Sequence, residues 1–76
     1  MRKRGMMLVM KQKPKTPGEA VRVLRLEAGL TIEQVAQIAG VSPSQISRVE
    51  TGAKTPSAAW LSVVVEAIAS ALRPAA

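Results

Sequence analysis

A chain of 76 residues with no cysteine and no histidine holds one small domain at most, and it has no disulfide, thiolate zinc site or imidazole acid–base catalyst. Because Trp60 is the only aromatic residue, aliphatic side chains and alanine must build the core. The formal net charge of +6 is carried entirely by residues 1–15, since the remaining residues balance five basic against five acidic side chains.

Residues 1–15 are predicted to be a flexible basic arm that precedes a domain over residues 16–76. Such a segment suits phosphate groups or an anionic membrane surface, and it is also typical of an unstructured tail that only keeps a protein soluble. Its apolar run, Met6 to Met10, is shorter than the roughly 7–15 apolar residues of a secretory signal or the about 20 of a membrane span. We therefore expect a cytoplasmic protein with no membrane partner.

The sequence TPGE, Thr16 to Glu19, predicts the start of a first helix. Threonine is a favoured N-cap residue, proline suits the first helical position, and glutamate three residues after the cap completes a capping box. The helix is expected to run to about Ala28 and to stop at Gly29. Its apolar face comprises Val21, Leu24 and Ala28.

Two further capping boxes, TIEQ at residues 31–34 and SPSQ at residues 42–45, predict a second and a third helix. The second helix ends at Gly40, and the third runs to about Thr51, before Gly52. The residues of this pair that are expected to point inward are Val35, Ala36, Ala39, Val41, Ile46 and Val49.

The joint between the second and third helices is short, because only Gly40, Val41 and Ser42 separate them. A three-residue turn favours the steep crossing of a helix-turn-helix. Ala36 is small where the two helices must approach, and glycine tolerates a left-handed backbone. With no strand pattern elsewhere, the sequence predicts an all-α domain.

A fourth helix is predicted from near Pro56 or Ser57 to about Leu72. Its apolar residues span a wider arc than one small core needs. The inner face is expected to comprise Leu61, Val64, Val65, Ile68 and Leu72. A second apolar face comprises Trp60, Val63, Ala67 and Ala71. Exposed apolar area usually marks a partner, so we expect a homodimer interface there. The alternatives are a core that extends further around the helix and a cover formed by Met6 to Met10.

The segments LRLEAGLT, VAQIAGVSPSQISRVETG and TPSAAWL continue this pattern over about Glu19 to Leu72. With these segments the chain resembles the Cro/repressor-type, or XRE-like, helix-turn-helix family. The resemblance implies a compact, lambda-repressor-like bundle of four to five helices that binds double-stranded DNA, usually as a dimer. It also implies that the third helix, Ser42 to Thr51, is the recognition helix.

The third helix carries short polar side chains on the side away from the core. At helical spacing, Ser44, Ser47 and Arg48 lie opposite Ile46 and Val49. Serine hydroxyls let a helix backbone lie deep in the major groove, where an arginine can reach a guanine edge or clamp a phosphate. An ordinary solvated face would show the same residues, and the resemblance decides in favour of DNA.

The resemblance also implies roles for individual positions. Base contacts are expected from Ser42, Pro43, Ser44, Gln45, Ser47 and Arg48. Phosphate contacts are expected from Thr31, Ile32, Thr51, Lys54 and Arg25. Ile32 departs from the family pattern, because members often carry a glutamine there that contacts the DNA backbone. In related repressors, the positions of Arg25 and Glu50 form an ion pair that joins the first helix to the end of the recognition helix.

The leading hypothesis is a sequence-specific DNA-binding regulator of a prokaryote or phage, acting as a repressor at the nucleoid without cofactor or metal. No catalytic residues are predicted, because the five acidic residues are scattered and form no pair. No sensing domain is predicted, so no small-molecule effector is expected. The alternative is the antitoxin of a toxin–antitoxin pair, which would bind a protein toxin and regulate its own operon.

Overall fold

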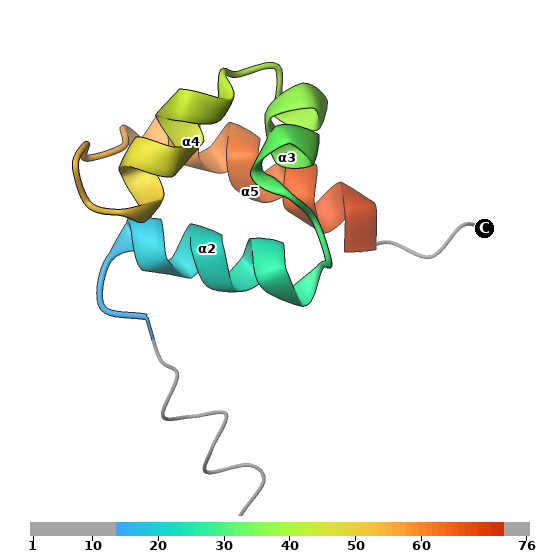
Figure 1. Ribbon diagram of the computed structural model, residues 1–76, viewed down its shortest axis with the longest axis horizontal. Helices are drawn as coiled ribbons and strands as arrows, with labels where there is room; N and C mark the ends of the chain where they lie inside the picture. The colour runs from blue at the N-terminus through green and yellow to red at the C-terminus, as the bar shows by residue number, and fades with distance from the viewer. Residues whose placement is uncertain (1–13, 73–76) are drawn as a thin grey trace, which may run out of the picture.

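The computed structural model describes residues 14–72, in which four helices surround one core (Figure 1). Their bounds are Pro17–Glu27 for α2, Ile32–Ala39 for α3, Pro43–Glu50 for α4 and Ala58–Leu72 for α5. Over this range no residue is in a strand, so the predicted all-α class is confirmed. The predicted basic arm lies outside the described residues up to residue 13, as do residues 73–76.

The starts of α3 and α4 follow from their capping boxes. Thr31 Oγ1 accepts the Gln34 amide at 3.0 Å, and Gln34 Oε1 accepts the Thr31 amide at 2.8 Å. Ser42 and Gln45 repeat both bonds, each at 3.2 Å. Each box satisfies two backbone N–H groups that have no acceptor inside the helix, which is why both helices begin where the sequence predicts.

The predicted capping box of α2 forms only in part. Thr16 Oγ1 accepts the Glu19 amide at 3.1 Å, as predicted. Glu19 Oε1, however, accepts the amide of Lys15 at 2.8 Å rather than that of Thr16. The carboxylate thus reaches one residue further towards the N-terminus, where it still satisfies a backbone N–H near the positive end of the helix.

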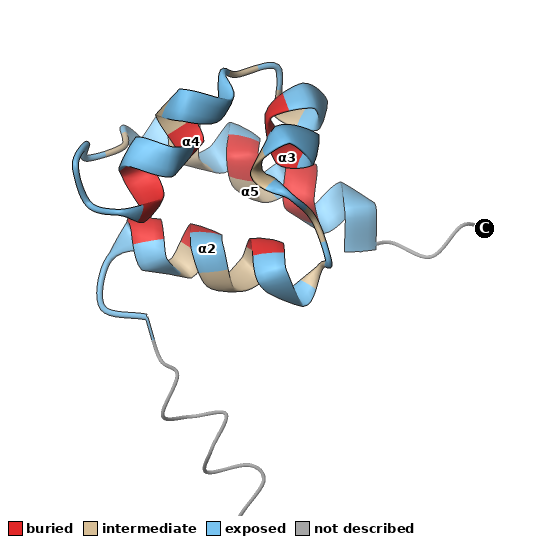
Figure 2. Cartoon of the chain, in the orientation of Figure 1, coloured by how far each residue is buried: buried red, intermediate tan, exposed pale blue. Residues whose placement is uncertain are grey.

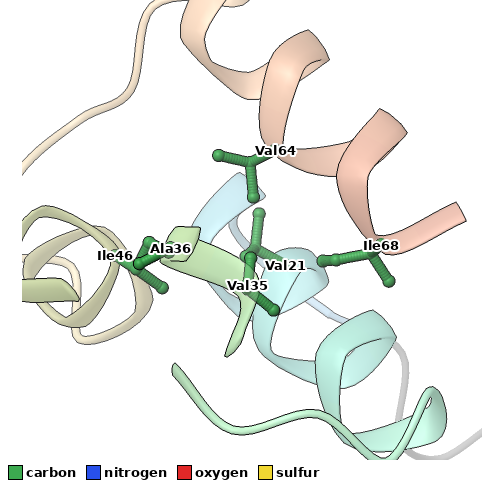
Figure 3. Close-up of a cluster of buried hydrophobic side chains, with 6 residues drawn as sticks. All are labelled: Val21, Val35, Ala36, Ile46, Val64 and Ile68. Carbon is green, nitrogen blue, oxygen red and sulfur yellow. The ribbon is translucent and has the colours of Figure 1, made fainter. Parts of the chain in front are cut away.

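The four helices pack in a closed arrangement, because α2 and α3 each contact both α4 and α5. In Figure 1, α2 lies along one side of the molecule, α3 and α4 lie along the other, and α5 lies behind them. Side chains from all four helices meet in the middle (Figure 3). The central cluster comprises Val21, Val35, Ala36, Ile46, Val64 and Ile68, each at most 3% exposed. The centre of the core is therefore entirely aliphatic, as the composition requires.

The turn between α3 and α4 is tight because a glycine ends α3 in the left-handed conformation. Gly40 has φ 74° and ψ 31°, which a residue with a Cβ rarely adopts. The amides of Gly40 and Val41 both donate to Ala36 O, at 2.9 and 3.1 Å. Ser42 then caps α4 at once, and the chain changes direction sharply between the two helices (Figure 1).

In α5, Val64 and Ile68 are buried as predicted, but the side that meets the core differs from the prediction at its edge and at its end. Ala67 is buried at 7% exposure, Trp60 is half-buried against the central cluster, and Leu72 is 52% exposed. The predictions of an exposed Ala67 and a buried Leu72 are therefore wrong. α5 contacts both α2 and α3, and its side chains that are buried or pack against the central cluster are Trp60, Leu61, Val64, Ala67 and Ile68. The end of α5, where Leu72 lies, extends past the other helices (Figure 1).

Candidate nucleic-acid interface

The side of α4 that faces away from the core is exposed (Figure 2), and its side chains are polar. Ser44, Ser47 and Arg48 are exposed, whereas Ile46 and Val49 on the opposite side are 0% and 2% exposed. The helix therefore presents two hydroxyls and one guanidinium to solvent while its other side anchors it in the core. These three groups can donate hydrogen bonds to a ligand without any change in core packing.

At the start of α4, the capping box restrains two of the predicted base-contacting residues. Gln45 is half-buried, and its Oε1 accepts the amide of Ser42. Ser42 Oγ accepts the Gln45 amide and lies 3.4 Å from Ser44 Oγ. Pro43 is exposed, but it has no polar side-chain group. The Nε2 group of Gln45 and the hydroxyl of Ser44 are what this end of the helix can offer to DNA.

At the end of α4, the chain folds back and brings Lys54 to the carbonyl of Arg48. Lys54 N–H donates to Arg48 O at 3.1 Å, and Thr51 Oγ1 donates to the same oxygen at 3.2 Å. Gly52 N–H donates to Val49 O at 3.1 Å and closes the loop. Arg48 and Lys54 are both exposed, so two cationic residues lie at or just after this end of the helix, while the Thr51 hydroxyl proton is already donated to Arg48 O. Such a group suits a DNA phosphate.

The start of α3 offers fewer side-chain contacts than the sequence predicts. Thr31 is exposed: its amide donates to Gln34 Oε1 and its Oγ1 accepts the Gln34 amide, which leaves the hydroxyl proton able to donate to a phosphate oxygen. Ile32 is half-buried and packs against the central cluster, which takes its side chain out of the predicted phosphate contacts. As the first helical residue, Ile32 still has a backbone N–H without an acceptor inside the helix. A phosphate at this helix start would be bound by the Thr31 hydroxyl and by backbone amides.

Arg25 and Glu50 form a bidentate ion pair between α2 and the end of α4. Arg25 Nε lies 2.7 Å from Glu50 Oε2, and Arg25 Nη2 lies 2.9 Å from Glu50 Oε1. Arg25 Nη1 donates to Leu30 O at 3.0 Å. The hydrogen bond to Glu50 raises the pKa of the Arg25 guanidinium, while burial lowers it and the negative charges of Glu50 and Glu33 raise it further.

Burial of this pair changes the role expected of Arg25. Both residues are 8% exposed, and all three guanidinium nitrogens of Arg25 donate to acceptors inside the protein. Arg25 was predicted both to pair with Glu50 and to contact a phosphate. The burial of its guanidinium fits the ion pair and does not fit the phosphate contact. Among residues 14–72 this is the one ion pair.

Gly18, in the first turn of α2, makes a close contact with α4 that was not predicted from the sequence. Gly18 is buried, and a Cβ at this position would lie 1.9 Å from Val49 O and 2.8 Å from Val49 C. α2 therefore approaches the backbone of α4 more closely than any residue with a side chain allows. The signal in the sequence was a glycine inside a predicted helix, where it is a poor helix former.

The residues predicted to form the dimer contact do not share one surface, because Trp60 and Val63 line two different hollows. One, of about 240 Å³, lies between α4, the loop after it and Trp60. The other, of about 320 Å³, lies between α3 and α5 and is lined by Ile38 and Val63 together with Ala39, Glu66, Ala67 and Ser70. Ile38 and Val63 are 51% and 47% exposed. Trp60 thus lies beside α4, while Val63 lies beside α3, and Ala71 is exposed further along α5.

Metal sites and membrane spans can also be assessed for the described residues. In the range 14–72, no three or more acidic, histidine or cysteine side chains come together where they could hold a metal ion. Over the same range, none of the helices has the length and apolar character of a membrane span.

Comparison with known proteins identifies the family of the domain. A family model described as a helix-turn-helix domain matches residues 18–73, which is most of the chain and nearly the whole of the four described helices. Neither a search of curated proteins nor a search of solved structures gives a significant match. The family match confirms the resemblance seen in the sequence and indicates a DNA-binding regulator. The chain therefore belongs to the helix-turn-helix domain family.

Proposed function

We propose that the protein is a sequence-specific regulator that binds double-stranded DNA, that it acts as a repressor in a prokaryote or phage, and that α4 is its recognition helix. The observation that carries the proposal is the exposed face of α4, where Ser44, Ser47 and Arg48 lie opposite the buried Ile46 and Val49. The family match supports DNA as the partner. A regulator of this kind acts in the cytoplasm, at the nucleoid.

In this proposal α4 lies in the major groove and Arg48 reads a base. The major groove is about 12 Å wide and admits an α-helix. Ser44 and Ser47 are short, so they let the helix backbone approach the base edges. Arg48 is the one charged residue among positions 43–49, and its fork can donate two hydrogen bonds to the O6 and N7 atoms of guanine. A contact of that kind contributes about 1–3 kcal/mol of discrimination between bases.

Phosphate binding is assigned to groups around α4 and to the basic arm. Lys54 lies in the loop just after α4, and the Thr31 hydroxyl and the first amides of α3 can bind a second phosphate. Residues 14–72 carry five basic and five acidic side chains, so the pair of cations at Arg48 and Lys54 is a local feature of this surface. Residues 1–13 add five basic side chains and no acidic one. These charges add affinity for any DNA sequence.

A homodimer is part of the proposal, because one short recognition helix covers only a few base pairs. A two-fold dimer would present two such helices to successive major-groove faces about 34 Å apart. We place the contact at the exposed apolar surface of Ile38 and Val63, extended by Ala71. Trp60 and Ala67 are left out of this surface, because they contribute to the core.

The alternative function, an antitoxin, shares the DNA-binding half of this proposal and adds a protein toxin as a second partner. The exposed hollow lined by Ile38 and Val63 is the feature that favours a protein partner of either kind. Purification from the native host separates the two functions. A second protein that co-purifies in equal amount, and is lost when Val63 is changed to glutamate, would favour the antitoxin.

Selection of DNA from a random-sequence duplex pool tests the proposed function. The parent protein is expected to enrich one motif, arranged as an inverted repeat because the dimer has two recognition helices. The Arg48→Ala variant is expected to enrich a motif that is relaxed at one position in each half-site, whereas Arg22→Ala, which changes an exposed arginine on α2, is expected to keep the full motif. Placed within a reporter promoter, the enriched motif is expected to lower expression when the protein is present. A pool that stays random contradicts the proposal.

A further inference from the structure

We propose that Gly18 is a positioning residue for DNA recognition. Because Gly18 has no side chain, α2 can pack closely against the last turn of α4. This spacing sets the positions of Arg48 and Lys54 relative to DNA. The inference rests on the proposed function, because it gives Gly18 a role in how α4 meets its ligand. Gly18 itself is buried, so its proposed role involves no direct contact with DNA.

The contact involves backbone on both sides, so no side-chain rotation can relieve it. A Cβ on Gly18 would lie 1.9 Å from Val49 O, 2.8 Å from Val49 C and 3.4 Å from Glu50 Cα. Real Cβ atoms essentially never approach another heavy atom closer than 3.0 Å. With any other residue at position 18, α2 and the end of α4 must therefore separate until that distance is exceeded.

The segment that would move, the last turn of α4 and the loop after it, includes Arg48 and Lys54. Val49 O, the atom nearest to the absent Cβ, also accepts the Gly52 amide at 3.1 Å. The preceding carbonyl, Arg48 O, accepts the Lys54 amide at 3.1 Å. The last turn of α4 and the loop after it are thus joined by hydrogen bonds and would shift together. A displacement at Val49 consequently displaces Arg48 and Lys54 relative to the start of α4.

Helix propensity alone does not favour a glycine at position 18. Glycine is the poorest helix former after proline, and a glycine-to-alanine change inside a helix ordinarily raises stability. At position 18 the close approach to Val49 reverses that expectation. The sequence thus keeps a residue that is unfavourable for α2 where it permits one particular spacing between α2 and α4.

The experiment compares Gly18→Ala with the parent protein on a duplex that the parent selects from a random pool. Affinity for that duplex is expected to fall about tenfold or more, which is the cost of losing one well-aligned arginine–guanine contact. The matched control is Ile68→Val, which deletes a buried methylene of α5 and leaves the Gly18–Val49 contact alone. At a temperature where all the proteins are folded, the control is expected to bind like the parent.

A double-mutant cycle separates positioning from a general loss of stability. If Gly18 acts through the placement of Arg48, then Gly18→Ala is expected to cost much less affinity in an Arg48→Ala background than in the parent. An equal loss in both backgrounds would overturn the proposal, and so would parent-like affinity and base preference in Gly18→Ala. If the parent enriches no motif at all, the proposed function fails and this inference fails with it. A parent that enriches a motif, together with an unaffected Gly18→Ala, refutes the inference alone.

A second background keeps the test decisive if Gly18→Ala does not fold. Ser62 is exposed on α5, and replacing it by alanine raises helix propensity away from α4 and outside the hollow between α3 and α5. The cycle is then repeated with Gly18→Ala in this stabilised protein. A variant that remains unfolded there would overturn the proposal, because Gly18 would then be needed for folding rather than for placement.

Discussion

Arg25 of α2 and Glu50 of α4 are joined by two hydrogen bonds of 2.7 and 2.9 Å, and this pair ties α2 to the last turn of the proposed recognition helix. Arg25 also holds Leu30 O, so the same side chain fixes the loop that leads into α3. Because both partners are buried, water cannot replace either one. The ion pair and the Gly18–Val49 contact lie at the same end of α4 and together fix its position against α2.

We predict that Glu50→Gln lowers the free energy of unfolding by about 3–5 kcal/mol, because it leaves the buried guanidinium of Arg25 without its counter-charge. Glu27→Gln, which makes the same chemical change at an exposed position on α2, is expected to stay within about 0.5 kcal/mol of the parent. Urea titration followed by circular dichroism measures both. Equal stability of the two variants would show that the pair contributes nothing.

We predict that Arg48→Ala keeps the stability of the parent and weakens binding to the selected duplex by about 1–3 kcal/mol. The reason is that Arg48 is exposed on the face opposite the core, so its loss removes a base contact and no packing. Base preference is expected to relax at one position in each half-site. Titration of labelled duplexes that carry single-base changes measures this, with Arg22→Ala as the control. An unchanged preference would remove Arg48 from the base contacts.

We predict that deleting residues 1–13 weakens binding to all DNA sequences by a similar factor. The deletion removes five basic residues and spares Lys15 and Thr16, whose bonds with Glu19 help to start α2. Each lost phosphate contact lowers the slope of log affinity against log salt concentration by about 0.9. Affinities for the selected and a scrambled duplex, measured over a series of salt concentrations, give this slope. The same slope in both proteins would mean that the arm does not touch DNA.

We predict that Trp60→Ala destabilises the fold by about 2 kcal/mol, less than the 3–5 kcal/mol typical of a fully buried tryptophan, because Trp60 is half-buried against the core. Chemical denaturation must be followed by circular dichroism, since the variant has no tryptophan to report fluorescence. A variant with the stability of the parent would return Trp60 to the outer surface and reopen its role as a dimer contact.

We predict that Val63→Glu gives a folded monomer with reduced affinity for the inverted repeat. The substitution places a charge in the exposed apolar surface that Val63 shares with Ile38, where a partner copy would bury it. Ser62→Glu adds the same charge one position away on an exposed residue and is expected to leave the dimer intact. Sedimentation at tens of micromolar measures the assembly. A parent protein that sediments as a monomer without DNA refutes this dimer.

Features governed by neighbouring residues in the chain could be predicted from the sequence. The capping boxes of Thr31 with Gln34 and of Ser42 with Gln45 placed the starts of α3 and α4, because a cap is decided within four residues. The exposed side of α4 followed from the same logic, since helical spacing alone separates Arg48 from Ile46.

Features governed by tertiary packing could not be predicted. α5 is apolar on adjoining faces, so its pattern does not decide which face turns inward, and the positions of α2 and α3 brought Ala67 into the core instead of Leu72. The expectation of a pair between Arg25 and Glu50 came from the family resemblance, because no local pattern joins residues so far apart. The contact of Gly18 with Val49 O is of the same kind, and it required the structure.

The exposed face of α4 is proposed to contact DNA, and the most direct measurement is a titration of the isotope-labelled protein with the selected duplex, followed by amide resonances. The largest changes are expected at Ser44, Ser47, Arg48 and Lys54, with little change at Ser62 on α5. Large changes on α5 with α4 unaffected would contradict the proposed recognition helix, because DNA would then bind a different face of the same fold.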